Sequence, residues 1–247
     1  MANSSHKKAS NSPVTSWAQW FDRAASLFAD PRMKIAYYRN GKTGKPYSQK
    51  AVRATLDHIW KKLKCRPEDV ILDVGCGVGF FSRAFLKKIK KIIGVDISPQ
   101  MIKSAFQLNP RATFLVCRAD ALCFKPKQFN HILSYGVTQY MAHASSVRAM
   151  LDNMRPLLQA GGRILIGDIL DPISKTSTKA SQRTTPQGKR WWPKELDHTL
   201  PKLYIPQKFF SGYSRKYKLT CKFFRQKIPG RYIPTPRYDV VMQSPEP

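Results

Sequence analysis

The chain has little negative charge for its size. Its 247 residues include 15 Asp and Glu against 43 Lys and Arg, which gives a formal net charge of +28 at pH 7. A field of this sign attracts RNA, anionic lipid and acidic metabolites at low ionic strength. The excess is spread along the whole chain without an arginine-rich run or a nucleic-acid module, so a basic host proteome is an equally good explanation.

Long apolar runs and paired cysteines are also missing, and no secretory leader is expected. No run approaches the ~20 apolar residues that span a bilayer, and no apolar stretch comes after Lys7 and Lys8. Five cysteines without C-x-x-C spacing argue against a zinc ribbon or a redox pair and favour a reducing compartment. We therefore expect a cytoplasmic protein without a metal site. The Ser-rich first 21 residues contain no acid, so an organelle transit peptide stays open.

Residues 70–82, which read VILDVGCGVGFFS, are the most informative stretch of the chain. An apolar segment over 70–74 predicts a strand that is buried on both faces. Gly75, Gly77 and Gly79 come next, and they remove the Cβ atoms that would obstruct a sharp turn and a closely approaching ligand. The helical spacing after them places free N–H groups over the loop. This pattern indicates a loop that binds a nucleotide-type cofactor.

The spacing of the glycines narrows the choice of cofactor. A dinucleotide fingerprint needs its third glycine where this chain has Phe80, and a phosphate-binding loop needs a Lys followed by Ser or Thr, which is absent. The acidic-x-G-x-G-x-G pattern that begins at Asp73 instead resembles the first motif of the class I S-adenosylmethionine-dependent methyltransferases. The resemblance covers about residues 68–170.

This resemblance implies an α/β fold: a Rossmann-like, seven-stranded, mostly parallel sheet with helices on both faces and an antiparallel last strand. Ahead of it we expect an N-terminal helical cap over residues 1–67. The methyltransferase core would occupy 68–247, with a loop or lid insertion at about 171–217. The further strands are expected at 91–95, 112–117, 129–135, 163–169, 219–224 and 238–242, the last two as antiparallel sixth and seventh strands.

Helix boundaries can be read from capping residues. Ser16 is expected to begin a helix with Trp17 on its apolar face, and Ser98 followed by Pro99 reads as an N-cap and a first helical residue. A longer helix, capped by Ser145, is expected to continue through Leu158 and to end before Gly161 and Gly162.

Two carboxylates lie just after expected strands, on the ligand side of the sheet. Asp96 comes 19 residues after Gly77, at the tip of the next strand, where a carboxylate can accept both ribose hydroxyls. The resemblance implies that Asp120 holds the adenine amino group, with the backbone of Ala121 against the ring. Asp is also common after strands because it favours turns, but both together beside a glycine loop favour binding.

The expected contacts of S-adenosylmethionine come from the glycine loop and from the ends of the second, third and fourth strands. Cys76 is included as a small residue of the loop rather than as a nucleophile. These positions are Asp73, Gly75, Cys76, Gly77, Gly79, Asp96, Ile97, Met101, Asp120, Ala121 and Ser134.

Methyl transfer from a sulfonium needs mainly in-line alignment and exclusion of water, and a base only if the acceptor must lose a proton. His143 is the preferred general base, because imidazole titrates near neutrality. Tyr140 and Tyr38 are further candidates for the catalytic site. The resemblance implies that the N-terminal segment folds over the cofactor, which would bring Tyr37 or Tyr38 to its methionine end. A purely structural role stays open for each of these residues.

The residues directly after the fourth strand constrain the acceptor. Adenine-N6 methyltransferases carry D/N-P-P-Y/F there, whereas this chain has Leu-Ser-Tyr-Gly at 133–136. The Pro-Cys nucleophile of cytosine-C5 enzymes is also absent. The run S-Y-G-V-T-Q-Y resembles small-molecule O- or N-methyltransferases, so we expect a small metabolite, a sugar or a lipid-linked acceptor. An RNA methyltransferase with another motif, or a non-catalytic basic nucleic-acid-binding protein on the same scaffold, stays an alternative.

Overall fold

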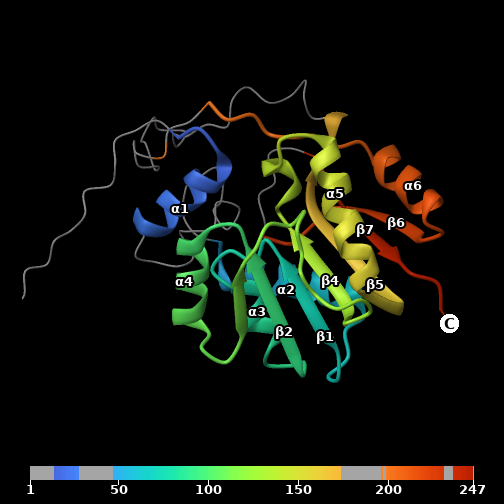
Figure 1. Cartoon of the computed structure of the whole chain (residues 1–247), viewed down its shortest axis with the longest axis horizontal. Coiled ribbons are helices and arrows are strands. Elements are labelled where there is room, and N and C mark those ends of the chain that lie inside the picture. Colours follow the sequence, from blue (N-terminus) through green and yellow to red (C-terminus); the bar gives the residue numbers. More distant parts are fainter. Residues whose placement is uncertain (1–13, 28–46, 174–195, 197–198, 231–235, 247) are drawn as a thin grey trace, which may run out of the picture.

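The computed structural model describes residues 14–27, 47–173, 196, 199–230 and 236–246. In these residues seven strands form one sheet in the order β3-β2-β1-β4-β5-β7-β6 (Figure 1). The strands are β1 Val70–Val74, β2 Lys91–Asp96, β3 Thr113–Val116, β4 Phe129–Tyr135, β5 Leu158–Leu170, β6 Thr220–Arg225 and β7 Arg237–Gln243.

Strand directions confirm the mostly parallel sheet with an antiparallel last strand. The β1, β2, β3, β4 and β5 pairings are parallel, and β7 pairs antiparallel with β5 on one side and β6 on the other. The expectation that the sixth strand is also antiparallel to the sheet was wrong. The helix between β5 and β6 makes a crossover that returns β6 in the direction of β5, and the chain then turns back to insert β7 between them.

Helices cover both faces of the sheet (Figure 1). On one face α2, α3 and α4 bury apolar side chains such as Ile59, Phe81 and Met101 against the strands. On the other face α5 and α6 bury Met150 and Phe210 in a second core. Each such side chain contributes about 1.5–3 kcal/mol by leaving water. The helices are α1 Trp17–Leu27, α2 Gln49–Leu63, α3 Phe80–Phe85, α4 Pro99–Leu108, α5 Ala144–Met154 and α6 Gln207–Lys216, with short 3₁₀ helices η3 Thr138–Tyr140 and η4 Arg155–Leu157.

Two of the expected helix starts are confirmed. The Ser16 hydroxyl accepts a hydrogen bond from the Gln19 N–H at 3.3 Å, at the start of α1. The Ser98 hydroxyl accepts one from the Met101 N–H at 3.1 Å, with Pro99 in the first turn of α4. The cap therefore fixes α4 immediately after the tip of β2.

The expected course of α5 was wrong at both ends. His143, not Ser145, is the N-cap residue, and its carbonyl accepts the N–H of Val147. The helix ends at Met154 because the adjoining η4 carries a proline in its first turn, and β5 already begins at Leu158. The glycine pair that was expected to end the helix lies inside β5, where the Gly161 N–H donates to the Pro245 carbonyl at 2.9 Å.

The two helices ahead of β1 have different surroundings. α2 shares the core of the sheet through Ile59 and Leu63, whereas α1 packs against α4 and reaches that core through Ala25 and Phe21 (Figure 1). The division of the chain at residue 67 and the insertion at about 171–217 stay predictions.

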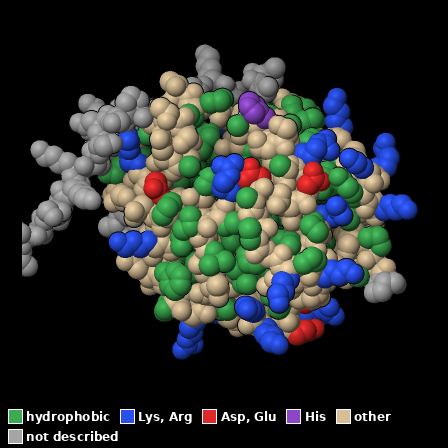
Figure 2. All heavy atoms as spheres, viewed as in Figure 1, with side chains coloured by type: hydrophobic (Ala, Val, Ile, Leu, Met, Phe, Trp, Pro, Cys, Tyr) green, Lys and Arg blue, Asp and Glu red, His purple; other side chains and the backbone are tan. Residues whose placement is uncertain are grey.

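The surface of the described residues reflects the composition. Lys and Arg side chains are spread around the margin of the face in Figure 2, with apolar side chains between them. Among the described helices, none is both long enough and apolar enough to cross a membrane. Nor do the described residues gather three or more His, Cys, Asp or Glu side chains in a way that would hold a metal ion.

Candidate functional site

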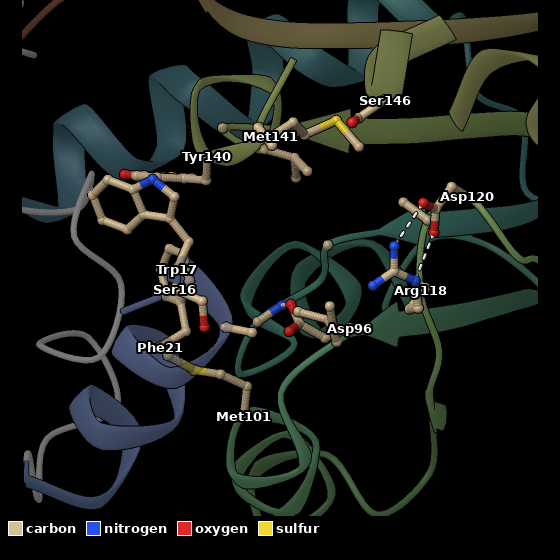
Figure 3. Close-up of a pocket in the computed structure, with 18 of the residues that line it drawn as sticks. Ser16, Trp17, Phe21, Asp96, Met101, Arg118, Asp120, Tyr140, Met141 and Ser146 are labelled. Atoms are coloured by element: carbon tan, nitrogen blue, oxygen red, sulfur yellow. Dashed lines mark hydrogen bonds and ion pairs between the residues drawn. The ribbon is translucent and has the colours of Figure 1, made fainter. Parts of the chain in front are cut away.

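A cavity of about 640 Å³ opens at the carboxyl ends of the parallel strands. The glycine loop after β1, the ends of β2, β3 and β4, helix α1 and the Leu200–Pro201 segment all contribute to its lining (Figure 3). Ligands bind at this edge in open α/β sheets, where the strand order reverses. The fold therefore places a cavity at the edge of the sheet where the glycine motif predicts a ligand.

The three glycines of the loop serve two different purposes. Gly75 and Gly79 have φ angles of +75° and +69°, and an added Cβ would meet Val137 at 2.3 Å and Phe114 at 2.6 Å. These two positions need glycine for the fold itself. Gly77, at φ +54°, lines the cavity and has nothing within 4 Å of an added Cβ. At Gly77 the missing side chain leaves room for a ligand.

Asp96 at the tip of β2 is held by backbone N–H groups. Its Oδ2 accepts from the Gly77 N–H at 2.8 Å and its Oδ1 from the Ser98 N–H at 2.9 Å. Burial raises the pKa of this carboxyl, and these hydrogen bonds act against that rise. A carboxylate oxygen can accept two hydrogen bonds, so each oxygen keeps capacity for a ligand hydroxyl. The arrangement fits the two hydroxyls of a ribose.

Helix α1 is fastened beside this carboxylate. Asp22 of α1 accepts a hydrogen bond from the Ser98 hydroxyl and another, at 3.1 Å, from the Gln100 N–H in the first turn of α4. An acidic side chain at a helix N-terminus is favourable because free N–H groups and the positive end of the helix dipole meet it. Asp22 was missed in the sequence, where nothing indicates which element α1 packs against.

Arg118 and Asp120 form an ion pair at the other end of the cavity (Figure 3). Arg118 donates from Nε to Oδ1 at 2.9 Å and from Nη2 to Oδ2 at 2.7 Å. The hydrogen bonds from Arg118 lower the pKa of Asp120 and keep it ionised. Sequence reasoning missed Arg118, which lies with Asp120 in the turn after β3, where the Ala121 N–H donates to the Arg118 carbonyl.

Three rings form what we call the aromatic wall of the cavity: Trp17 and Phe21 of α1 and Tyr140 of η3 (Figure 3). The Tyr140 ring centroid lies 4.7 Å from that of Trp17 and 4.9 Å from that of Phe21, both edge to face. The Trp17 indole N–H donates to the Pro201 carbonyl at 3.0 Å, which ties α1 to the Leu200–Pro201 segment of the lining.

The structure brings most of the predicted site residues together. Those in the cavity lining are Gly75, Cys76, Gly77, Asp96, Ile97, Met101, Asp120, Tyr140 and His143. Burial raises the pKa of the Cys76 thiol well above its usual value, which suits a small apolar filler. His143 is exposed at the rim, where its side chain makes no capping hydrogen bond to α5. Their roles in binding and catalysis stay predictions.

Other predicted residues do not line this cavity. Asp73 is buried beneath the loop and accepts a hydrogen bond from the Ser82 hydroxyl at 2.8 Å. Ser134 is buried with its Oγ 3.9 Å from the Met150 sulfur, and Ala121 comes directly after the lining residues. Gly79 packs on Phe114. Tyr38 lies outside the described residues.

Known proteins are similar in sequence to this region. Residues 71–162 match the family model described as "Methyltransferase domain". The chain is 26% identical over 162 residues to a ubiquinone biosynthesis O-methyltransferase of Xylella fastidiosa, which covers 60% of this chain and 63% of that protein. It is 27% identical over 173 residues to a 2-methyl-6-phytyl-1,4-hydroquinone methyltransferase of Synechocystis, which covers 65% of this chain and 52% of that protein. The chain thus spans less than two thirds of either relative.

Solved structures share the fold. Phosphoethanolamine N-methyltransferase 1 of Haemonchus contortus superimposes with a TM-score of 0.67 at 13% identity, over 92% of this chain and 48% of that chain. At this identity the likeness concerns the fold. Residues 71–162 are therefore similar in sequence to a methyltransferase domain, in a chain that has the fold of the class I S-adenosylmethionine-dependent methyltransferases.

Proposed function

We propose that this protein binds S-adenosylmethionine in the cavity and transfers its methyl group to oxygen or nitrogen of a small-molecule, sugar or lipid-linked acceptor. The observation that carries the proposal is the Asp96 carboxylate, bonded to the Gly77 N–H beside the open space at that glycine. The names of the relatives support it, since one is an O-methyltransferase of ubiquinone biosynthesis and the other is a methyltransferase of a phytyl hydroquinone.

The residues present fit this cofactor. Asp96 would accept the ribose hydroxyls, Asp120 would accept from the adenine amino group, and Gly77 would admit the amino-acid part close to the backbone. The structural neighbour from Haemonchus contortus was solved with S-adenosylhomocysteine, the demethylated form of the cofactor. When bound, the cofactor supplies a methyl group on a sulfonium, which is a good leaving group.

The chain itself would align the acceptor and exclude water. The aromatic wall and the Leu200–Pro201 segment present apolar surface to the cavity, so an acceptor would lose its hydration as it enters. His143, which lines the cavity, would take a proton from an acceptor that must lose one. We also propose that the protein acts in the cytoplasm, as expected from the sequence.

Titration calorimetry with S-adenosylhomocysteine tests the proposal. We expect binding to one site per chain, because the described part of the chain offers one set of glycine loop, ribose carboxylate and adenine carboxylate in this cavity. Transfer of a radiolabelled methyl group from S-adenosylmethionine to a component of a cell extract then tests turnover. Absence of calorimetric binding would refute the proposal.

RNA is the second candidate acceptor, favoured by the net charge of +28. Treating the extract with ribonuclease before the assay separates the two cases. Loss of labelled product would favour RNA, whereas an unchanged product would favour the small molecule.

A further inference from the structure

The cavity extends beyond the residues assigned to the cofactor, and this further part is lined by different side chains. Its surface comes from the aromatic wall, Met141, Leu200 and Pro201, with the Ser16 and Ser146 hydroxyls among them (Figure 3). The Trp17 N–H is engaged by the Pro201 carbonyl, so this indole offers apolar ring surface to a ligand. Resting on the proposed function, we propose that the acceptor is an uncharged aromatic alcohol that packs against the aromatic wall.

An anionic acceptor does not match the lining. Among the described lining residues, the charged side chains are Asp96, Asp120 and Arg118. The Arg118 guanidinium is engaged in two hydrogen bonds to Asp120. A carboxylate or phosphate against the aromatic wall would therefore be desolvated without a cation of its own, which is costly.

A cationic acceptor is disfavoured by long-range electrostatic repulsion. The net charge of +28 repels a cation approaching the mouth. Inside, the Asp96 and Asp120 carboxylates are the groups assigned to the ribose and the adenine of the cofactor, and Asp120 is also paired with Arg118. Neither sign of charge is accommodated, so the lining suits a neutral molecule.

The wall also suits an aromatic rather than an aliphatic neutral molecule. Aromatic rings prefer edge-to-face or offset contacts with centroids about 4.5–7 Å apart, and both contacts of Tyr140 in the wall are of this kind. Thioether sulfur is also favourable beside a ring, and Met141 and Met101 line the same cavity. The Ser146 hydroxyl lies in that lining to orient a hydroxyl group, and the Ser16 hydroxyl, which accepts from the Gln19 N–H, can still donate there.

The transfer to such an acceptor balances without a further reactant. The hydroxyl oxygen forms a bond to the methyl carbon as the carbon–sulfur bond breaks, and the electron pair of that bond stays on sulfur to give a neutral thioether. The hydroxyl proton leaves to His143, which lines the same cavity, or through it to water.

Three probes with the same ring system and different charge test this inference: naphthol, naphthoate and naphthylmethylammonium. Their binding is measured by calorimetry on protein saturated with S-adenosylhomocysteine. We expect naphthol to bind at least about tenfold more tightly than either charged probe, because each carries a desolvation penalty of more than about 1.4 kcal/mol. Equal or tighter binding of a charged probe overturns the inference.

Substitutions in the aromatic wall test whether naphthol binds there. Trp17→Ala and the milder Phe21→Leu should weaken naphthol binding, the former by about tenfold, and leave the affinity for S-adenosylhomocysteine unchanged. The matched control is Phe106→Ala, which removes a 49% exposed ring of α4 that is outside the cavity lining and should leave both affinities unchanged. Naphthol binding that is unaffected by both wall variants overturns the inference.

The result for the cofactor keeps the two proposals apart. If wild-type protein binds S-adenosylhomocysteine but not naphthol, the acceptor class is wrong and the proposed function stands. If it does not bind S-adenosylhomocysteine, the proposed function fails and the acceptor class fails with it.

Discussion

The Asp96 carboxylate accepts a hydrogen bond from the backbone N–H of Gly77, 2.8 Å away and 19 residues earlier in the chain. This contact joins the tip of β2 to the loop after β1 at the wall of the cavity. It holds the carboxylate in place before any ligand arrives. We infer that hydrogen bonds between the Asp96 carboxylate and the ribose largely determine the affinity for the cofactor.

Asp96→Ala should weaken the binding of S-adenosylhomocysteine by about thirtyfold, because hydrogen bonds to a charged group contribute roughly 1.5–3 kcal/mol. Asp96→Asn should fall between wild type and Ala, since its amide keeps one acceptor oxygen. Calorimetry measures both. Asp152→Ala is the control, because this carboxylate accepts from the Tyr213 hydroxyl at 2.9 Å and is outside the cavity lining. Equal affinities in all four proteins would contradict the ribose assignment.

Gly77→Ala should abolish most cofactor affinity while the fold persists. The new Cβ meets no protein atom within 4 Å, so it obstructs the ligand and not the protein. It also strains the left-handed backbone at this position. Gly161→Ala is the matched control: its φ is +71°, its nearest contact is an ordinary 3.6 Å to Glu246, and it lies outside the cavity lining. Both variants should lose about 1–2 kcal/mol of stability, but Gly161→Ala should bind S-adenosylhomocysteine normally. A similar affinity in the two variants would show that Gly77 does not face the ligand.

Asp73 makes the stability of the protein depend on pH. Burial raises the pKa of this carboxyl to about 7, above the value of about 3.9 for an unfolded Asp. The folded state therefore binds the proton more tightly, and its contribution to stability is present below about pH 4 and lost as the pH rises to about 7. Asp73→Asn should remove this component. Urea unfolding at several pH values should show wild type losing stability relative to the variant across that window, and a constant difference would contradict the assignment.

Asp239 on β7 links its strand to α2, to β5 and to the residue that follows β6. Its carboxylate lies 2.5 Å from His58 Nε2 of α2 and accepts from Gln226 Nε2 at 2.7 Å and from the Asp168 N–H at 2.9 Å. Asp239→Ala leaves these groups without their acceptor and should cost about 3–5 kcal/mol of unfolding free energy. Asp57→Ala, at an exposed position of α2 next to His58, should change stability by less than about 0.5 kcal/mol.

Equal denaturation midpoints for Asp239→Ala and Asp57→Ala would show that the buried carboxylate is not needed for stability.

The hydrogen bonds of Asp239 also reach the cavity, because Gln226 Nε2 donates to the Tyr135 hydroxyl at 2.8 Å and Tyr135 lines the cavity. A loss of stability at Asp239 should therefore be accompanied by weaker cofactor binding.

His143→Ala should lower turnover without lowering the affinity for S-adenosylhomocysteine, once an acceptor is found. The side chain lies at the rim and makes no capping hydrogen bond, so its removal leaves α5 intact. Removal of a general base typically costs 10²–10⁴-fold in rate. An unchanged rate would exclude His143 from the mechanism.

The sheet and the glycine loop were predictable because local rules agree there. The apolar strand 70–74, the capping pair of Ser98 and Pro99, and the carboxylate at the tip of the next strand each result from short-range patterns. Their meeting at one edge results from the parallel order of the strands.

Other features depend on packing that no short pattern reports. Leu157 and Leu158 continue the apolar spacing of α5, yet Pro156 lies in the turn where that helix has ended, and apolar residues serve a buried strand equally well. Likewise, Asp22 looks like an ordinary surface residue of an amphipathic helix until α1 docks on α4.

A crystal structure of the protein with S-adenosylhomocysteine tests the central claim most directly. The account predicts that both ribose hydroxyls lie within hydrogen-bonding distance of the Asp96 carboxylate, that the adenine amino group faces Asp120, and that the ligand passes over Gly77. A ligand bound elsewhere, or bound in this cavity with its ribose away from Asp96, would contradict it.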